Sequence, residues 1–180
     1  LRYHYSDGGN SVNYWFELSD ALRNFGEDFT KKNKEVRKVI ATYNDTGSDV
    51  ERVAEAYTWI QNTIRNISYD SRREEGQKYK ENKNANDVIK RGYGSLEDIN
   101  FLFYTMMLEM GFDARVVFVS DRNEDLFVPD AKYWQFDTPI IAVFIKGFQY
   151  YSPGHLYLPI THVPASFESI RGFMTGGASR

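Results

Sequence analysis

The residues that decide the fold run from 94 to 117 and read Gly94-Ser-Leu-Glu-Asp98, then Ile-Asn-Phe-Leu-Phe-Tyr-Thr-Met-Met-Leu-Glu, then Met110-Gly-Phe-Asp-Ala-Arg-Val-Val117. Ser95, with Asp98 three residues later, predicts a capped helix start, because each side chain can accept a hydrogen bond from the backbone of the other residue. Gly111 is a typical helix end. Since nearly every position between them is large and apolar, we expect this helix to lie at the centre of the core.

Helical spacing of apolar residues also dominates the chain before this stretch. Gly26 lies inside the first such pattern and is expected to break or bend that helix. Ser48 and Glu51 form a second capping-box pattern, which predicts the start of another helix. We expect helices before the central one at 14–29, 34–43, 48–64 and 86–91.

After the central helix the pattern changes to strands. Two runs of β-branched and apolar residues follow, and only Lys146-Gly147 separates the second run from the next one, which predicts a hairpin. Helices first and strands later favour an α+β fold, with N-terminal helices and a central helix packed on an antiparallel sheet. The expected strands are 114–119, 139–145, 148–152 and 155–158.

The length and net charge of the chain limit the classes of protein to which it can belong. A length of 180 residues suits one structural domain, which we divide into an N-terminal helical segment (1–47), a core (48–175) and a frayed tail (176–180). The formal charge of −3 gives no basic footprint for nucleic acid. No apolar run approaches the roughly 20 residues that cross a bilayer, so no transmembrane segment is expected.

The chain contains no cysteine, which excludes disulfides, thiolate metal sites and a cysteine nucleophile. Asp121, Asn123 and Asp125 alternate as in a calcium loop, but Leu126 and Lys132 stand where that loop needs Gly and Glu. We therefore interpret these residues as a polar surface loop. The histidines have no metal-binding spacing. No metal and no cofactor are expected.

The order of these segments resembles a known family. Ala56-Tyr-Thr-Trp-Ile60, Ile64-Arg-Asn-Ile-Ser-Tyr69, Gly94-Ser-Leu-Glu-Asp98 and Met110-Gly-Phe-Asp-Ala-Arg-Val-Val117 are similar to successive motifs of bacterial transglutaminase-like domains, which have the papain-like cysteine protease fold. The resemblance spans about residues 50–160. It implies the same α+β core for this chain.

The same resemblance locates the residues that carry the chemistry of the family. There, a thiolate attacks a glutamine amide or peptide carbonyl, a histidine transfers the proton and an aspartate orients the histidine. The matching positions in this chain are Leu96, Thr138 and Ser152. None of these side chains can replace its counterpart, so the resemblance implies a degenerate domain without catalysis.

Two functions remain open at this stage. The first is a binding or scaffolding module that keeps the cleft of the family and holds a peptide, a glycan or a protein partner. The residues expected to line that cleft are Tyr93, Ser95, Leu96, Trp134 and Thr138.

The alternative is a weak hydrolase with rebuilt chemistry. It would use Ser95 as the nucleophile and His155 or His162 as the base, although Ser95 is also explained as a helix cap. A hydrogen bond between Ser95 Oγ and a histidine would support this alternative.

The family context also implies a setting for the chain. The helices around Trp15 resemble the segment that follows a β-rich domain of unknown function in large extracytoplasmic bacterial proteins. We therefore expect this chain to be part of a larger polypeptide with a periplasmic or secreted location.

Overall fold

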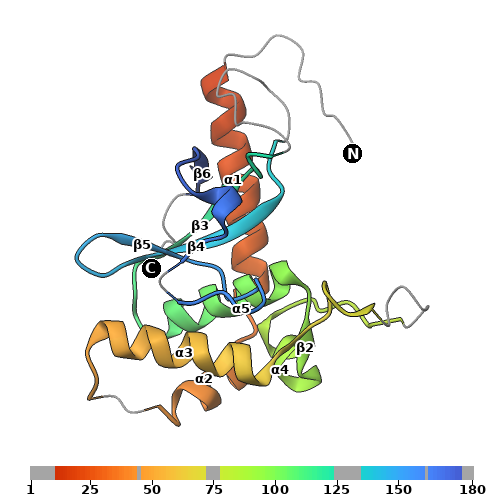
Figure 1. Cartoon of the computed structure of the whole chain (residues 1–180), viewed down its shortest axis with the longest axis vertical. Coiled ribbons are helices and arrows are strands. Elements are labelled where there is room, and N and C mark those ends of the chain that lie inside the picture. Colours follow the sequence, from red (N-terminus) through yellow and green to blue (C-terminus); the bar gives the residue numbers. More distant parts are fainter. Residues whose placement is uncertain (1–10, 44–45, 72–77, 124–134, 161, 176–180) are drawn as a thin grey trace.

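The structure, a computed structural model, describes residues 11–43, 46–71, 78–123, 135–160 and 162–175. In this part of the chain, helices precede an antiparallel sheet (Figure 1). The helices are α1 (Ser11–Thr30), α2 (Lys34–Ile40), α3 (Asp49–Thr63), α4 (Ala85–Arg91) and α5 (Leu96–Glu109). The strands are β1 (Arg65–Asn66), β2 (Tyr93–Gly94), β3 (Ala114–Val119), β4 (Thr138–Phe144), β5 (Phe148–Tyr151) and β6 (Gly172–Met174).

Helix α5 is the centre of the core, as predicted. It packs against α1, α2, α3 and α4 and against strands β3 and β4. Its first turn carries the expected capping box, in which Ser95 Oγ accepts from the Asp98 N–H and Asp98 accepts from the Ser95 N–H, both at 3.1 Å. The side chains of this helix that are at most 2% exposed are Ile99, Asn100, Leu102, Phe103, Thr105, Met106 and Met107.

The larger sheet has the strand order β5-β4-β3-β6, and every neighbouring pair is antiparallel. Lys146 (φ 65°) and Gly147 (φ 152°) lie in the turn that joins β4 to β5, which confirms the predicted hairpin. One face of the sheet packs on α5 through Ile141 and Val143, and the other covers a smaller apolar cluster around Phe167. The α+β fold expected from the sequence is therefore confirmed.

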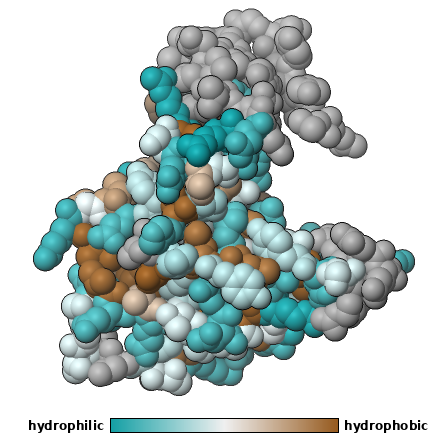
Figure 2. Space-filling view, in the orientation of Figure 1, coloured by the Kyte–Doolittle hydropathy of each residue, from teal (hydrophilic) through white to brown (hydrophobic). Residues whose placement is uncertain are grey.

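The distribution of hydrophobic residues on the surface follows the arrangement of the helices and the sheet. Figure 2 shows brown, hydrophobic residues gathered along the middle of the molecule, where the sheet and α5 lie, and paler or teal residues below them, over α2 and α3. Phe29 of α1 and Val36 of α2 belong to the same buried core as α5, so the N-terminal helices pack on the rest of the domain. The boundary at residue 47 stays a prediction.

The strand predicted at 155–158 is wrong. These residues form turns, and Tyr157 has a left-handed backbone (φ 59°) that a strand does not allow. The segment instead bends back to α3, where Tyr57 Oη donates to the Leu158 carbonyl at 2.9 Å. The outer position beside β3 is taken by β6, whose three residues carry too little pattern to be recognised in the sequence.

The helix break predicted at Gly26 is also wrong, because α1 continues through this residue to Thr30. A Cβ built at Gly26 would lie 3.6 Å from Phe101 Cε1 and 3.8 Å from Tyr104 Cε1. Gly26 therefore brings α1 close to α5 within a regular helix.

Some expectations fall on residues without a described position, namely Trp134, most of the loop from Asp121 to Lys132, and the tail at 176–180. Among the residues with described positions, no three His, Asp or Glu side chains form a group that could hold a metal ion. In that same part of the chain, no helix has the length and apolar character required to span a bilayer.

The environment of Gly26 predicts that Gly26→Ala is stabilising. The added methyl would make ordinary van der Waals contacts, and alanine is the better helix former, so we expect the free energy of unfolding in urea to rise by about 0.5–1 kcal/mol. Gly94→Ala is the matched control, because a Cβ there would lie only 2.9 Å from Asp98 Cβ. This control should be destabilised. A loss of stability in Gly26→Ala would contradict the packing described for α1.

Candidate functional site

The first turn of α5 holds the position at which the family resemblance expects a nucleophile. Leu96 is the first helical residue, and only 9% of it is exposed. Its backbone N–H donates to Ser68 Oγ at 2.9 Å. Leu96 is therefore an apolar residue at the margin of the core, with its backbone donor already used.

The two partner positions are buried as well. Thr138 is the first residue of β4, pairs with Val119 of β3 and is 9% exposed. Ser152 follows β5 and is fully buried. The elements that carry these two positions meet at the beginning of α5.

Asn100, one turn after Leu96, holds these elements together. Its Nδ2 donates to the Pro139 carbonyl at 2.8 Å and to Ser152 Oγ at 3.1 Å. Its Oδ1 accepts from the Gly154 N–H at 2.9 Å. One fully buried amide therefore joins α5, the start of β4 and the loop after β5. The chain neighbours of all three family positions thus meet in one place.

Sequence reasoning did not single out Asn100. The available signal was a single amide within the apolar run Ile99 to Phe103, four residues after Leu96. An amide in a fully buried helix face needs hydrogen-bond partners, because burying it without them costs about 1–3 kcal/mol. This signal indicates that Asn100 takes part in a buried hydrogen-bond network, but it does not identify the residues that pair with Asn100.

The loop after β5 lies directly on the first turn of α5. A Cβ built at Gly154 would be 2.4 Å from the Leu96 carbonyl oxygen and 3.0 Å from Asn100 Oδ1, so only glycine allows this approach. Asn66 of β1 fixes the loop from the other side, because its Nδ2 donates to the Gly154 carbonyl at 2.5 Å. The backbone of this loop is therefore part of the interior.

His155 lies beside Ser152, and its Nδ1 is 2.7 Å from Ser152 Oγ. Ser152 Oγ also accepts from Asn100 Nδ2, so the serine hydroxyl is hydrogen-bonded to both neighbours. Burial lowers the pKa of His155, and the Glu97 carboxylate offsets part of this effect. The pair resembles a nucleophile with its base, but the fully buried Ser152 cannot reach a substrate.

Ser95 is engaged in a different set of interactions. Its Oγ accepts from the Asp98 N–H and donates to Glu97 Oε2 at 2.8 Å. Asp98 is partly buried, which raises its pKa, while the hydrogen bond from Asn82 lowers it. The hydrogen bond from Ser95 to a histidine that the alternative hydrolase requires is not formed in the described structure.

Of the residues predicted to line a cleft, Tyr93, Ser95, Leu96 and Thr138 have described positions. Ser95 lines a cavity of about 830 Å³ between the end of α1, residues 78–83 and the first turn of α5, whereas Leu96 and Thr138 are buried outside its lining. Tyr93 Oη accepts from the Lys80 N–H at 3.2 Å and holds residues 78–83 against β2. His162 donates its backbone N–H to the Pro159 carbonyl at 3.0 Å.

The Asn100 network predicts that Asn100→Ala is strongly destabilising. The substitution leaves the Gly154 N–H and the Pro139 carbonyl without partners in the interior, so we expect the free energy of unfolding to fall by about 2–4 kcal/mol. Urea unfolding followed by circular dichroism measures this change. Asn62→Ala, on the exposed side of α3, is the matched control and should change stability by less than about 0.5 kcal/mol. Equal effects in the two variants would contradict the network.

The partly buried His155 ring predicts a loss of stability in acid. A folded-state pKa below the ordinary 6.5 means that the unfolded chain binds the proton more readily, so this ring begins to destabilise the fold as the pH falls through 6.5. Between about pH 7.5 and about pH 5.5, the wild type should therefore lose more unfolding free energy than His155→Gln, which cannot titrate there. Parallel stability curves for the two proteins would show that this ring does not contribute.

Comparisons with known proteins agree with this arrangement. The family model described as the transglutaminase-like superfamily matches residues 36–156. A crystal structure of a candidate protease from Parabacteroides distasonis superposes with a TM-score of 0.54 at 18% identity, over 73% of this chain and 26% of that one. A candidate cysteine protease from Cytophaga hutchinsonii gives a TM-score of 0.43 at 15% identity, over 95% of this chain and 55% of that one.

At 18% identity the first of these structures bears on the fold alone. This chain spans only part of the length of each. A search of curated proteins found no match. The family model covers well over half of the chain, including the central helix, the strand that begins at Thr138 and the loop that carries Ser152. The chain therefore belongs to the transglutaminase-like superfamily.

Proposed function

We propose that this chain is a catalytically inactive transglutaminase-like domain that serves as a binding or scaffolding module for a peptide, glycan or protein partner. The observation that carries the proposal is the state of the three family positions. Leu96, Thr138 and Ser152 are all buried, and the Ser152 hydroxyl is hydrogen-bonded to Asn100 and His155. All three side chains therefore lie in the protein interior.

The chemistry of the family, as the resemblance implies it, requires a thiolate, a base and an orienting carboxylate that act as a unit. A leucine provides no nucleophile, and the chain has no cysteine at any other position. Threonine is not a base near neutral pH. Losing one member of such a unit costs about 10³-fold or more in rate, and here all three differ.

The nearby serines do not rebuild this chemistry. Ser95 is held in the helix cap by Asp98 and Glu97. Ser152 has a histidine partner but no exposed surface. Both observations favour binding over hydrolysis. The extracytoplasmic location is proposed together with this function, on the family resemblance alone.

The direct test is an assay of the purified chain with glutamine-containing peptides, which measures ammonia release and the incorporation of a primary amine. We expect both rates to equal the buffer blank, because no group in reach can attack the amide. Ser95→Ala and Leu96→Ala are the control variants, and a contaminating enzyme would give equal rates in all three samples. Turnover in the wild type that disappears in a folded Ser95→Ala variant would overturn the proposal.

A further inference from the structure

Strand β5 forms one edge of the larger sheet and carries no charged residue. It reads Phe148-Gln-Tyr-Tyr151, and the single charged residue of the β4–β5 hairpin is Lys146 in the turn. Proteins usually protect the edges of their sheets with charged side chains, with prolines or with very short strands. The opposite edge follows that rule, because β6 has only three residues and Arg171 directly precedes it. The edge at β5 is therefore the less protected of the two.

The hydrogen-bond pattern of the sheet determines which backbone groups of β5 face outward. The Phe144 N–H donates to the Asp113 carbonyl, so the even-numbered residues of β4 bond toward β3 and its odd-numbered residues bond toward β5. By the register of the hairpin, these odd-numbered residues pair with the odd-numbered residues of β5. The N–H and C=O groups of Phe148 and Tyr150 therefore point away from the sheet, and no other residue with a described position is hydrogen-bonded to them.

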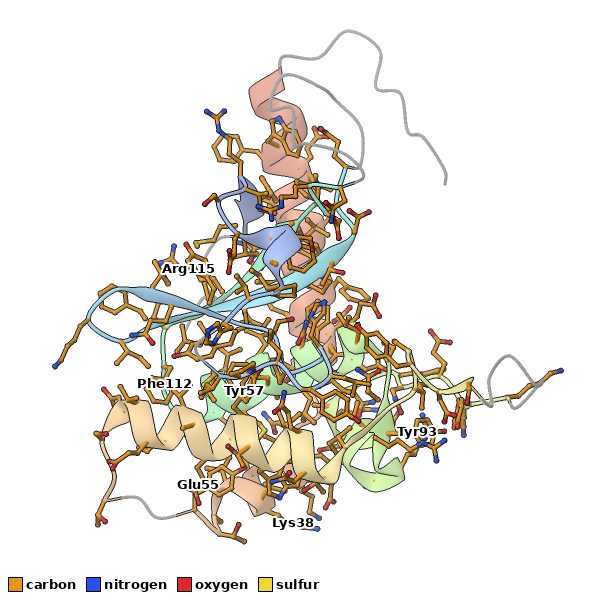
Figure 3. The ribbon with its side chains drawn as sticks, in the orientation of Figure 1. Lys38, Glu55, Tyr57, Tyr93, Phe112 and Arg115 are labelled. Atoms are coloured by element: carbon orange, nitrogen blue, oxygen red, sulfur yellow. The ribbon has the colours of Figure 1, made fainter. Side chains whose placement is uncertain are left out.

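The side chains of the same two residues lie on the face of the sheet that points away from α5. Phe148 packs on the apolar cluster of that face, and its ring centre lies 5.4 Å from that of Phe144 and 4.9 Å from the Arg115 guanidinium carbon. Figure 3 shows Arg115 on the side of the hairpin opposite to Tyr57. Phe144 is 50% exposed and Tyr150 is 44% exposed. The edge with free backbone groups thus also carries exposed aromatic rings.

This edge is complementary to a second copy of itself. When two β5 strands pair antiparallel about a twofold axis between their Gln149 residues, the outward groups of Phe148 meet those of Tyr150 in the other copy, and the reverse. Each Phe148 ring then lies beside a Tyr150 ring, which is a favourable cross-strand pair. Such a symmetric arrangement sets a central residue opposite its own copy, so a charge there would be repelled, and β5 has none. The uncharged sequence therefore favours a second copy as the occupant.

We propose that this chain forms a symmetric dimer in which the two β5 strands pair antiparallel, with Gln149 at the twofold axis, and join the two sheets into one. Because β5 has only four residues, the contact is small, and we expect a dissociation constant on the order of 100 µM. The inference concerns a surface other than the three family positions. It goes beyond the proposed function and does not depend on the absence of catalysis.

The test is sedimentation equilibrium of the whole chain from about 10 µM to about 1 mM, where the average mass should rise toward that of a dimer. Gln149→Glu and Gln149→Lys each set like charges opposite each other at the axis, so each should weaken the dimer by about fivefold or more. An equimolar mixture of the two variants should restore it, because unlike charges then meet. Gln149 is exposed, and Gln149→Glu keeps the acceptor for Tyr151 Oη, so we expect both variants to fold, which circular dichroism checks.

Hydrogen exchange locates the contact within the chain. The amides of Phe148 and Tyr150 point toward solvent in the monomer, so they should exchange more slowly at about 1 mM than at about 10 µM. The amides of Gln149 and Tyr151 already bond to β4 and should change less.

The matched control is Asn62→Glu, which adds the same charge at an exposed position of α3, and this variant should dimerise as the wild type does. The inference is overturned if the wild type stays monomeric at about 1 mM, if Gln149→Glu dimerises as the wild type does, or if the mixture of the two Gln149 variants stays monomeric. Because the assay with glutamine peptides is independent, a monomeric and inactive chain refutes only the dimer. A dimer that shows turnover refutes only the inactive module.

Discussion

The buried amide of Asn100 is the interaction on which the rest of the structure depends. It lies in the most apolar helix of the fold, where an unpaired amide would cost about 1–3 kcal/mol. It makes three hydrogen bonds, one to the start of β4 and two to the loop that follows β5. Apolar packing would tolerate small shifts of α5 along the sheet. The hydrogen bonds of Asn100, in contrast, form only when α5 lies in one position relative to β4 and the loop after β5.

The same buried network determines what surrounds the three family positions. A buried charged aspartate or histidine would carry a desolvation cost that only paired charges and hydrogen bonds can offset. Ser152 and His155 form a neutral pair in a similar place and avoid that cost. Leu96 adds apolar surface at the edge of the core, where a reactive side chain would need access to solvent. All three positions are therefore occupied by uncharged side chains that suit a buried environment.

The parts of the fold that the sequence predicts are those determined by local patterns. Helix α5 was predictable because its caps and its apolar run lie within twenty residues, and the hairpin was predictable because its turn residues are adjacent. Strand β6 was not, because three residues become a strand only by pairing with β3, more than fifty residues earlier. The close approach of α1 at Gly26 to the rings of Phe101 and Tyr104 is likewise a long-range contact that no local pattern reveals.

The candidate site also has parts that the sequence predicts and parts that it does not. Leu96 lies at the predicted helix start, Thr138 directly precedes the strand predicted at 139–145, and Ser152 ends the strand predicted at 148–152. The contacts that decide what these positions do come from the loop after β5, where a strand had been expected. Ser152 and Gly154 of this loop pack on α5, and the Leu158 carbonyl accepts from Tyr57 of α3. The burial of Ser152 and the exposed position of Tyr157 therefore both depend on how this one loop is held between α5 and α3.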